Sequence, residues 1–245
     1  MTTKRTLTAR TPGPVYLDVS TGAFNVVVFT GDREFGEVTV STADDAGPSA
    51  EAVNAATLDA DGARLTARFP KSAGGVTIVG GGGHVQIGNG NVQVNSFGGV
   101  TVSGSNYGVI STGRGVYVNG QLVTGGAAVS PVQIVAQLPH GSSVRFESQS
   151  GDLRVSGRLR QATANSQSGD VDLDEVATVN ADTMSGDISI GMLTGHADLH
   201  SMSGDISVHG SKPAHASART MSGDVRGTGG LLLAGSSMSG RVRNR

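Results

Sequence analysis

The amino-acid sequence predicts an all-β protein organised around a β-solenoid, and three observations lead to this class. A short phrase centred on Ser-Gly recurs six times in the last third of the chain, and its glycines are 18, 17, 18, 19 and 17 residues apart. This period is too short for a pair of helices and suits one coil of a solenoid. The 38 glycines are interleaved with Val, Ile and Thr in strand-like runs, and the residues of each repeat alternate in polarity. The repeated glycines are Gly151, Gly169, Gly186, Gly204, Gly223 and Gly240.

Residues 1–70 are expected to form a small β unit that caps the first coil. Short alternating or apolar runs, separated by Gly, Asp and Pro, predict an antiparallel meander or the edge of a sandwich. A helix is predicted from Ser49, because Pro48 precedes it and Glu51 falls in its first turn. A cap is needed since an open end of the stack would expose unpaired strand edges.

Residues 71–130 differ in composition from the rest of the chain. They contain seventeen glycines and no Asp or Glu, and short apolar runs such as HVQI and NVQV recur between glycine-rich turns. We expect very short strands joined by Asn-Gly and Gly-Gly turns, either as tight coils or as a β-ladder. A glycine-rich loop is the alternative.

Residues 131–245 are expected to form the solenoid, in one continuous body with the rest. Within one repeat, one face of an extended segment is predicted to point inward, a glycine turn follows, and aliphatic residues then point inward again. The inward positions expected in the third repeat are Val179, Ala181, Thr183, Ser185, Ile188 and Ile190. The last repeat has Arg241 in place of Asp, followed by Arg243 and Arg245, and a charged terminal strand discourages further stacking.

Charge and composition exclude several functional classes. The net charge of −2 and the lack of long basic runs give no support for binding nucleic acid or an anionic membrane. No apolar run reaches the length of a membrane span, so direct membrane insertion is not expected. No secretion signal is recognisable, so a cytoplasmic location is expected. Export to the cell surface by an unrecognised route is the alternative. The absence of cysteine excludes disulfides and thiolate metal sites.

The chain resembles a bacterial family of unknown function that is labelled "putative adhesin". The resemblance rests on the Pro-Val-x-Leu-Asp-Val run at Pro14, the Gly/Val-rich middle, the Leu-Pro-x-Gly step at Leu138 and the serial Ser-Gly-Asp units. It implies a right-handed β-solenoid. It also implies a role connected with adhesion or with the cell-envelope stress response.

The repeated aspartates are the first candidate site. Five carboxylates in register would repel one another unless they accept hydrogen bonds from turn amides, which is the commoner role, or share cations. The calcium-binding Gly-Gly-x-Gly-x-Asp repeat is absent. The column consists of Asp152, Asp170, Asp187, Asp205 and Asp224.

His196, Asp198 and His200 form the second candidate, since their alternation places all three on one face of a strand. Imidazole and carboxylate groups together are ligands for zinc or nickel. The same residues are also common on solvent-facing strands, and no cofactor is expected.

Methionines make the third candidate. Strict alternation places them outside, as an apolar stripe suited to protein contacts, whereas a glycine bulge would place them in the core. They are Met184, Met202, Met221 and Met238.

No catalytic motif is present: the sequence lacks a Gly-x-Ser-x-Gly elbow, a phosphate-binding loop and a His-Glu-x-x-His helix. The serine that precedes each repeated glycine recurs in every unit, as a structural residue does. We therefore predict a non-enzymatic scaffold or interaction module that binds a protein partner or self-associates. The alternatives are an exported adhesin or glycan-binding protein and, third, a polysaccharide-modifying enzyme, which would need a cleft with paired acidic groups.

Overall fold

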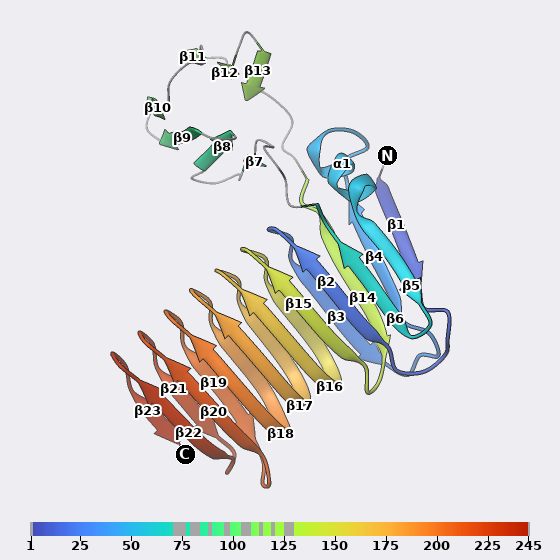
Figure 1. Cartoon of the computed structure of the whole chain (residues 1–245), viewed down its shortest axis with the longest axis vertical. Helices are drawn as coiled ribbons and strands as arrows, with labels where there is room; N and C mark the ends of the chain where they lie inside the picture. Colours follow the sequence, from blue (N-terminus) through green and yellow to red (C-terminus); the bar gives the residue numbers. More distant parts are fainter. Residues whose placement is uncertain are drawn as a thin grey trace. The chain divides into compact units, whose positions relative to one another are not determined.

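The computed structural model describes residues 2–70 and 130–244, together with the backbone of the short strands between them. The chain forms two compact units, Met1–Pro70 with Ser130–Arg245, and Lys71–Val129. The first unit contains a β-solenoid of about six turns, and α1 is the one helix among the described residues. The predicted all-β solenoid is therefore confirmed (Figure 1).

Strands of the solenoid stack in parallel and in register. From the first repeat onward they are β15 (Ser143–Ser148), β16 (Leu153–Ser166), β17 (Val171–Thr183), β18 (Ile188–Ser201), β19 (Ile206–Gly210), β20 (His215–Thr220), β21 (Val225–Thr228), β22 (Leu232–Ser237) and β23 (Val242–Asn244).

Each coil contributes to two walls. The first wall follows the Ser-Gly-Asp turn and contains the first halves of β16, β17 and β18, then β19, β21 and β23. The second wall precedes the next turn and contains β15, the second halves of the long strands, then β20 and β22. The long strands pass from one wall to the other at a bulge, where the pairing register shifts. One of these bulges lies at Gly157, whose φ of 95° is a conformation that favours glycine.

The two walls bury side chains of different size in the core between them. The first wall buries aliphatic residues such as Val171 and Ile188, which are register partners. The second wall buries Ala164, Ala181 and Ala218, with Leu199 as a larger member of the same column. Branched side chains therefore pack against small ones across the stack.

The N-terminal segment differs from the predicted meander, because part of it belongs to the stack. Strands β2 (Tyr16–Thr21) and β3 (Val26–Gly31) pair in parallel with β15 and β16, one in each wall. Strand β14 (Gln133–Pro139) pairs in parallel with β3. The alternation that predicted an antiparallel unit is shared by parallel strands exposed on one face, so the run alone did not separate the two cases.

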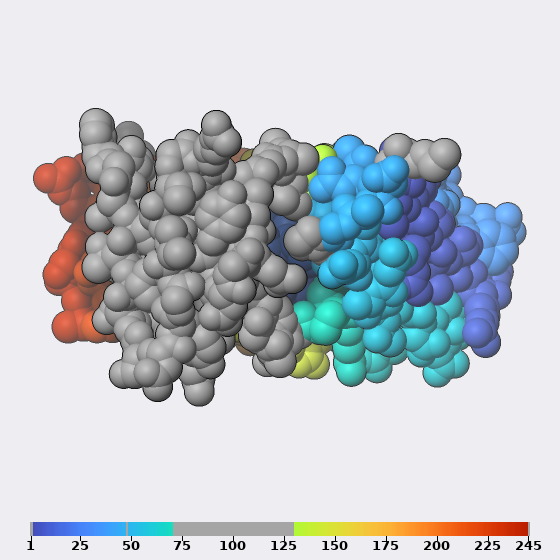
Figure 2. Space-filling view, turned by 90° about the horizontal axis from the view of Figure 1, so that it is seen from above, coloured from blue at the N-terminus to red at the C-terminus, as the bar shows by residue number. Residues whose placement is uncertain are grey.

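Antiparallel strands and α1 cover the N-terminal end of this stack. In the first wall, β4 (Glu37–Thr42) pairs antiparallel with β14, and β1 (Thr3–Thr8) pairs antiparallel with β4. In the second wall, β6 (Arg64–Arg68) still pairs in parallel with β2, and β5 (Thr57–Asp61) pairs antiparallel with β6. Helix α1 (Pro48–Ala55) is present where a helix was predicted, begins one residue earlier than the predicted start at Ser49, and packs on β1 and β4. This end and the last coil lie at opposite ends of the unit (Figure 2).

The second unit contains short antiparallel strands. One sheet has the order β10-β9-β8-β7 and the other β11-β12-β13. Antiparallel pairing matches the β-ladder rather than the tight coils of the two strand arrangements predicted here. The predicted Asn-Gly and Gly-Gly turns lie outside the described residues. The strands are β7 (Thr77–Ile78), β8 (His84–Ile87), β9 (Gly90–Asn95), β10 (Gly99–Ser103), β11 (Val109–Thr112), β12 (Gly115–Val118) and β13 (Gln121–Thr124).

Candidate functional site

The turn edge of the solenoid, where the Ser-Gly-Asp phrases stack, brings together most of the residues singled out by the sequence. Its glycine column is set by close approach between coils. A Cβ at Gly186 would overlap the carbonyl oxygen of Gly169, and one at Gly169 would overlap that of Gly151. The column also includes Gly204, Gly223 and Gly240, each of which meets the carbonyl of the glycine one coil before.

The aspartate column connects successive coils through hydrogen bonds. The backbone N–H of Asp170 donates to Oδ1 of Asp152 at 3.0 Å, and that of Asp187 donates to Oδ1 of Asp170 at 2.9 Å. Asp205 and Asp224 continue the series at 2.8 Å each. The carboxylates therefore serve the turn amides of the next coil, and each column member is both donor and acceptor.

The two ends of the aspartate column differ from its middle. Asn25, in the turn between β2 and β3, provides the oxygen that accepts the backbone N–H of Asp152 at 3.0 Å. At the other end the backbone N–H of Arg241 donates to Asp224 at 3.0 Å, and Arg226 donates to the same carboxylate at 3.1 Å. These bonds, first that from Arg241 and then that from Arg226, lower the pKa of Asp224. Arg241 and Arg243 are exposed, and Arg245 lies outside the described residues.

Two serine positions have different roles. The inward hydroxyl column contains Ser166, Thr183 and Ser201, and the Ser166 Oγ accepts the backbone N–H of Gly169 at 2.8 Å. Ser185 was predicted to point inward as well, but it is exposed. The reason is that Met184 and Ser185 both lie in the turn, where the alternation of the strand no longer applies.

The methionine column lies outside the core. Met184, Met202 and Met221 are 51%, 47% and 47% exposed, and Met238 is 79% exposed. The column follows the stack, because the backbone N–H of Ser203 bonds to the carbonyl of Met184 and that of Ser222 to the carbonyl of Met202. Of the two placements considered for these side chains, the structure has the exposed one.

A groove of about 760 Å³ runs beside the methionine column. Its other side is the outward column of the second wall, two residues before each methionine, which we call the polar column. The hydroxyl column contributes to its lining between them. In order along the stack, the polar column contains Glu147, Asn165, Asp182, His200, Arg219 and Ser236. The sequence did not reveal this column because its members share neither charge nor size. The one signal in the sequence is that each of them lies two residues before a repeated Met or Gln.

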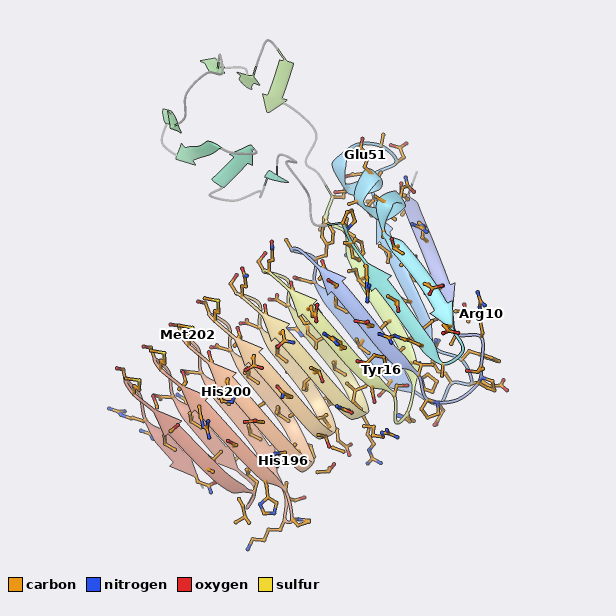
Figure 3. All side chains as sticks on the ribbon, in the orientation of Figure 1. Arg10, Tyr16, Glu51, His196, His200 and Met202 are labelled. Atoms are coloured by element: carbon orange, nitrogen blue, oxygen red, sulfur yellow. The ribbon has the colours of Figure 1, made fainter. Side chains whose placement is uncertain are left out.

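The candidate metal ligands His196, Asp198 and His200 lie on the outer face of β18. His200 Nε2 is 3.3 Å from Asp198 Oδ1, and His196 lies further from the turn, in register with His215 of β20 (Figure 3). Among the described residues no group of three or more His, Asp or Glu side chains is arranged to hold a metal ion. His200 is also a member of the polar column.

An ion-pair cluster on β2 was not predicted. The buried carboxylate of Asp18 accepts a hydrogen bond from Arg64 at 2.7 Å and lies 3.5 Å from Arg68. Arg64 also stacks on the ring of Tyr16, with 5.3 Å from the guanidinium carbon to the ring centroid. This cluster joins β2 to β6, where the capping strands meet the first coil.

Comparison with known protein families identifies the family of the chain. The model of the Toastrack DUF4097 family matches residues 84–229, more than half of the sequence. The chain belongs to the Toastrack DUF4097 family. The predicted resemblance to a bacterial family of unknown function is thereby confirmed.

Solved structures similar to this Toastrack chain have low sequence identity. A "putative adhesin" from Bacteroides fragilis has a TM-score of 0.50 at 13% identity, with 99% of this chain and 97% of that chain covered. A "putative lipid binding protein" from Parabacteroides distasonis has a TM-score of 0.38 at 12% identity, with coverage of 98% and 96%. A "putative adhesin" from the same species has a TM-score of 0.35 at 10% identity, with coverage of 100% and 97%. The first of these shows a shared fold.

No curated protein matches the Toastrack chain in sequence. Within the described residues, no helix combines the length and the apolar character needed to span a membrane.

Proposed function

We propose that the solenoid is a non-enzymatic interaction module that contacts a protein partner, or a second copy of the chain, through the methionine column. The observation that carries this proposal is the row of four methionines, each about half exposed or more, on consecutive coils. A flexible, polarisable thioether adapts its shape to an apolar surface, so such a row suits a protein contact.

The methionines are not needed to hold the turn together. Gln149 and Gln167 occupy the same position in the first two repeats, and their backbone carbonyls accept the same bond from the next coil. A polar side chain therefore fits the turn equally well. The apolar choice in the later coils is better explained by what the surface contacts than by packing.

The repeated polar residues support a non-enzymatic role. The aspartate carboxylates accept hydrogen bonds from turn amides, and the Ser166 and Ser201 hydroxyls of the inward hydroxyl column bond to backbone groups of the glycine column. These groups have a structural use in coil after coil, as expected for a scaffold.

A photo-crosslinking residue at position 202 tests the proposal in cells, with the same residue at Ser207 as a matched control. Ser207 is exposed on the first wall, close in sequence and on the following strand. We expect protein crosslinks from position 202 that are lost in the Met184→Gln/Met221→Gln background, and none from position 207. Light scattering after size-exclusion chromatography shows whether the crosslinked protein is a second copy. Equal crosslinking at 202 with and without the two substitutions would contradict the proposal.

A surface adhesin or glycan-binding protein is the second candidate, supported by the name of the Bacteroides fragilis protein that shares the fold. Cell fractionation and protease treatment of intact cells separate it from an intracellular scaffold. Protein found only in the cytoplasmic fraction removes the adhesin role.

A further inference from the structure

Building on that proposed function, we infer that the groove beside the methionine column receives an amphipathic α-helix of a partner protein. The partner helix lies along the stack, across the strands, with its apolar stripe on the methionines and oppositely charged residues toward its two ends. The direction of the groove, the repeat distance of its side chains and the charges along it support such a helix.

The direction of the groove excludes ordinary strand addition. Both of its sides are columns that run from coil to coil, so an occupant lies perpendicular to the strands of the second wall. A peptide that pairs with a sheet edge runs along the strands instead and uses backbone hydrogen bonds. Here the occupant contacts side chains, so the spacing of those side chains along the stack determines which occupant fits.

The spacing fits a helix better than an extended chain. Successive coils repeat at about 4.8 Å, and a helix presents its stripe once per turn of about 5.4 Å. Over the three steps from Met184 to Met238 the mismatch accumulates to about 1.8 Å, which a flexible methionine accommodates. An extended chain presents side chains on one face about every 6.6 Å. Over the same three steps its mismatch exceeds about 5 Å, which is more than the distance between two successive coils.

The length of the groove sets the length of the partner helix. Four methionines on consecutive coils span about 14 Å, which corresponds to nine or ten residues at about 1.5 Å per residue. This length holds two to three turns, with apolar residues at positions i, i+3, i+4 and i+7.

Charges along the polar column determine which charged residues the partner helix needs toward each of its ends. Asp182 lies toward the early coils and Arg219 two coils later, about 10 Å away. Among the described residues neither has an ion-pair partner within 4.0 Å, whereas Glu147 is paired with Arg145. His200, between them, lies 3.3 Å from Asp198. A partner with a basic residue near Asp182 and an acidic residue near Arg219 complements both groups.

A second copy of the chain does not provide this helix from its described residues. Their helix α1 has Ala50 and Val53 buried, because that face packs on β1 and β4. No helix of the described residues is therefore available as the occupant, and we infer a segment of a different protein.

A library of random 16-residue peptides tests the inference. Selection is carried out on the wild-type chain, with counter-selection on the Met184→Gln/Met202→Gln/Met221→Gln variant, whose unfolding temperature is first shown to match the wild type. We expect enriched peptides with apolar residues at a period of 3.6 and opposite charges toward opposite ends. Bound peptides should show helical circular dichroism, and fluorescence anisotropy should show at least tenfold weaker binding to the methionine variant.

The Asp182→Lys/Arg219→Glu variant tests the charge assignment separately. It should bind the selected peptides about three- to tenfold more weakly, and exchange of the peptide's basic and acidic residues should restore the affinity. Enriched peptides with period-two alternation, or a library without methionine-dependent binders, would overturn the helical partner. The crosslinking at position 202 decides the proposed protein contact independently of this result.

Discussion

The backbone N–H of Asp187 donates a hydrogen bond of 2.9 Å to the carboxylate of Asp170, one coil earlier. The same bond recurs along the column, so each aspartate holds the turn of the next coil. Asn25 performs this role for Asp152 with an uncharged amide oxygen. The column therefore needs an acceptor oxygen at each position, and a negative charge is not required for the geometry.

Asp187→Ala is expected to destabilise the chain by about 1 kcal/mol, because the backbone N–H of Asp205 loses its acceptor. Asp187→Asn should cost less, since the amide oxygen replaces the carboxylate oxygen and like-charge repulsion along the column is reduced. Urea unfolding at neutral pH measures both variants. Equal losses in the two variants would show that the charge, and not the acceptor, is what matters.

Gly186→Ala is expected to destabilise by at least about 3 kcal/mol, because the new methyl group overlaps a backbone carbonyl that no rotamer change can move. Gly22→Ala is the matched control. Gly22 occupies the position of Gln149 in the turn between β2 and β3, and a Cβ there meets nothing within 4 Å. Chemical denaturation should show a stability change of less than about 0.5 kcal/mol for the control. A similar loss in both variants would contradict the close-approach explanation.

Thr183→Val is expected to leave stability unchanged or raise it by up to about 1 kcal/mol. The buried Oγ1 of Thr183 makes no hydrogen bond with any other described residue, so its removal relieves a desolvated polar group. Ser166→Ala should instead destabilise by about 1 to 2 kcal/mol, because the buried N–H of Gly169 loses its acceptor. Thermal unfolding distinguishes the two, and a loss in Thr183→Val as large as that in Ser166→Ala would refute this assignment.

Acidification is expected to weaken the last coil through Asp224. The pKa of this carboxyl is lowered in the folded chain by the hydrogen bond from the Arg241 N–H and then by that from Arg226. A depressed pKa stabilises the fold above the unfolded value of about 3.9, and that contribution is lost as the pH falls through the folded value. The protection factors of the β23 amides, in which the intrinsic pH dependence of exchange is already removed, should therefore decrease below about pH 4. The Asp224→Asn variant should show a smaller pH dependence there, and identical profiles would contradict the prediction.

The Met184→Gln/Met202→Gln variant is expected to unfold within about 0.5 kcal/mol of the wild type, because both side chains are exposed and Gln149 and Gln167 fill the same position naturally. Met202→Leu serves as the apolar control. Thermal and urea unfolding measure both. A loss of more than about 2 kcal/mol in the double variant would indicate that the methionines contribute to the core.

Several local features could be predicted from the sequence because they repeat or follow from short-range rules. The steps between the repeated glycines predicted the stack, and Pro48 with Glu51 predicted the start of α1. The prediction that Ser185 points inward was wrong, since alternation applies within a strand and not through the Ser-Gly-Asp turn. The contribution of β2 and β3 to the stack was also missed. Their turn carries Asn25 and Phe24 in place of Asp and Gly, so the repeat phrase is absent there although the spacing of the strands is kept.

Sequence alone determined the period, the all-β class and the recurrence of glycine, aspartate and methionine, because these depend on neighbours along the chain. Tertiary structure decided which of these columns faces outward, and that Asp182, His200 and Arg219 share one side of a groove with the methionines. The physical reason is that parallel stacking in register places residues 17 to 19 positions apart directly above one another. Whether they form a surface, a ladder or a core depends on the path of each coil, which the local pattern does not specify.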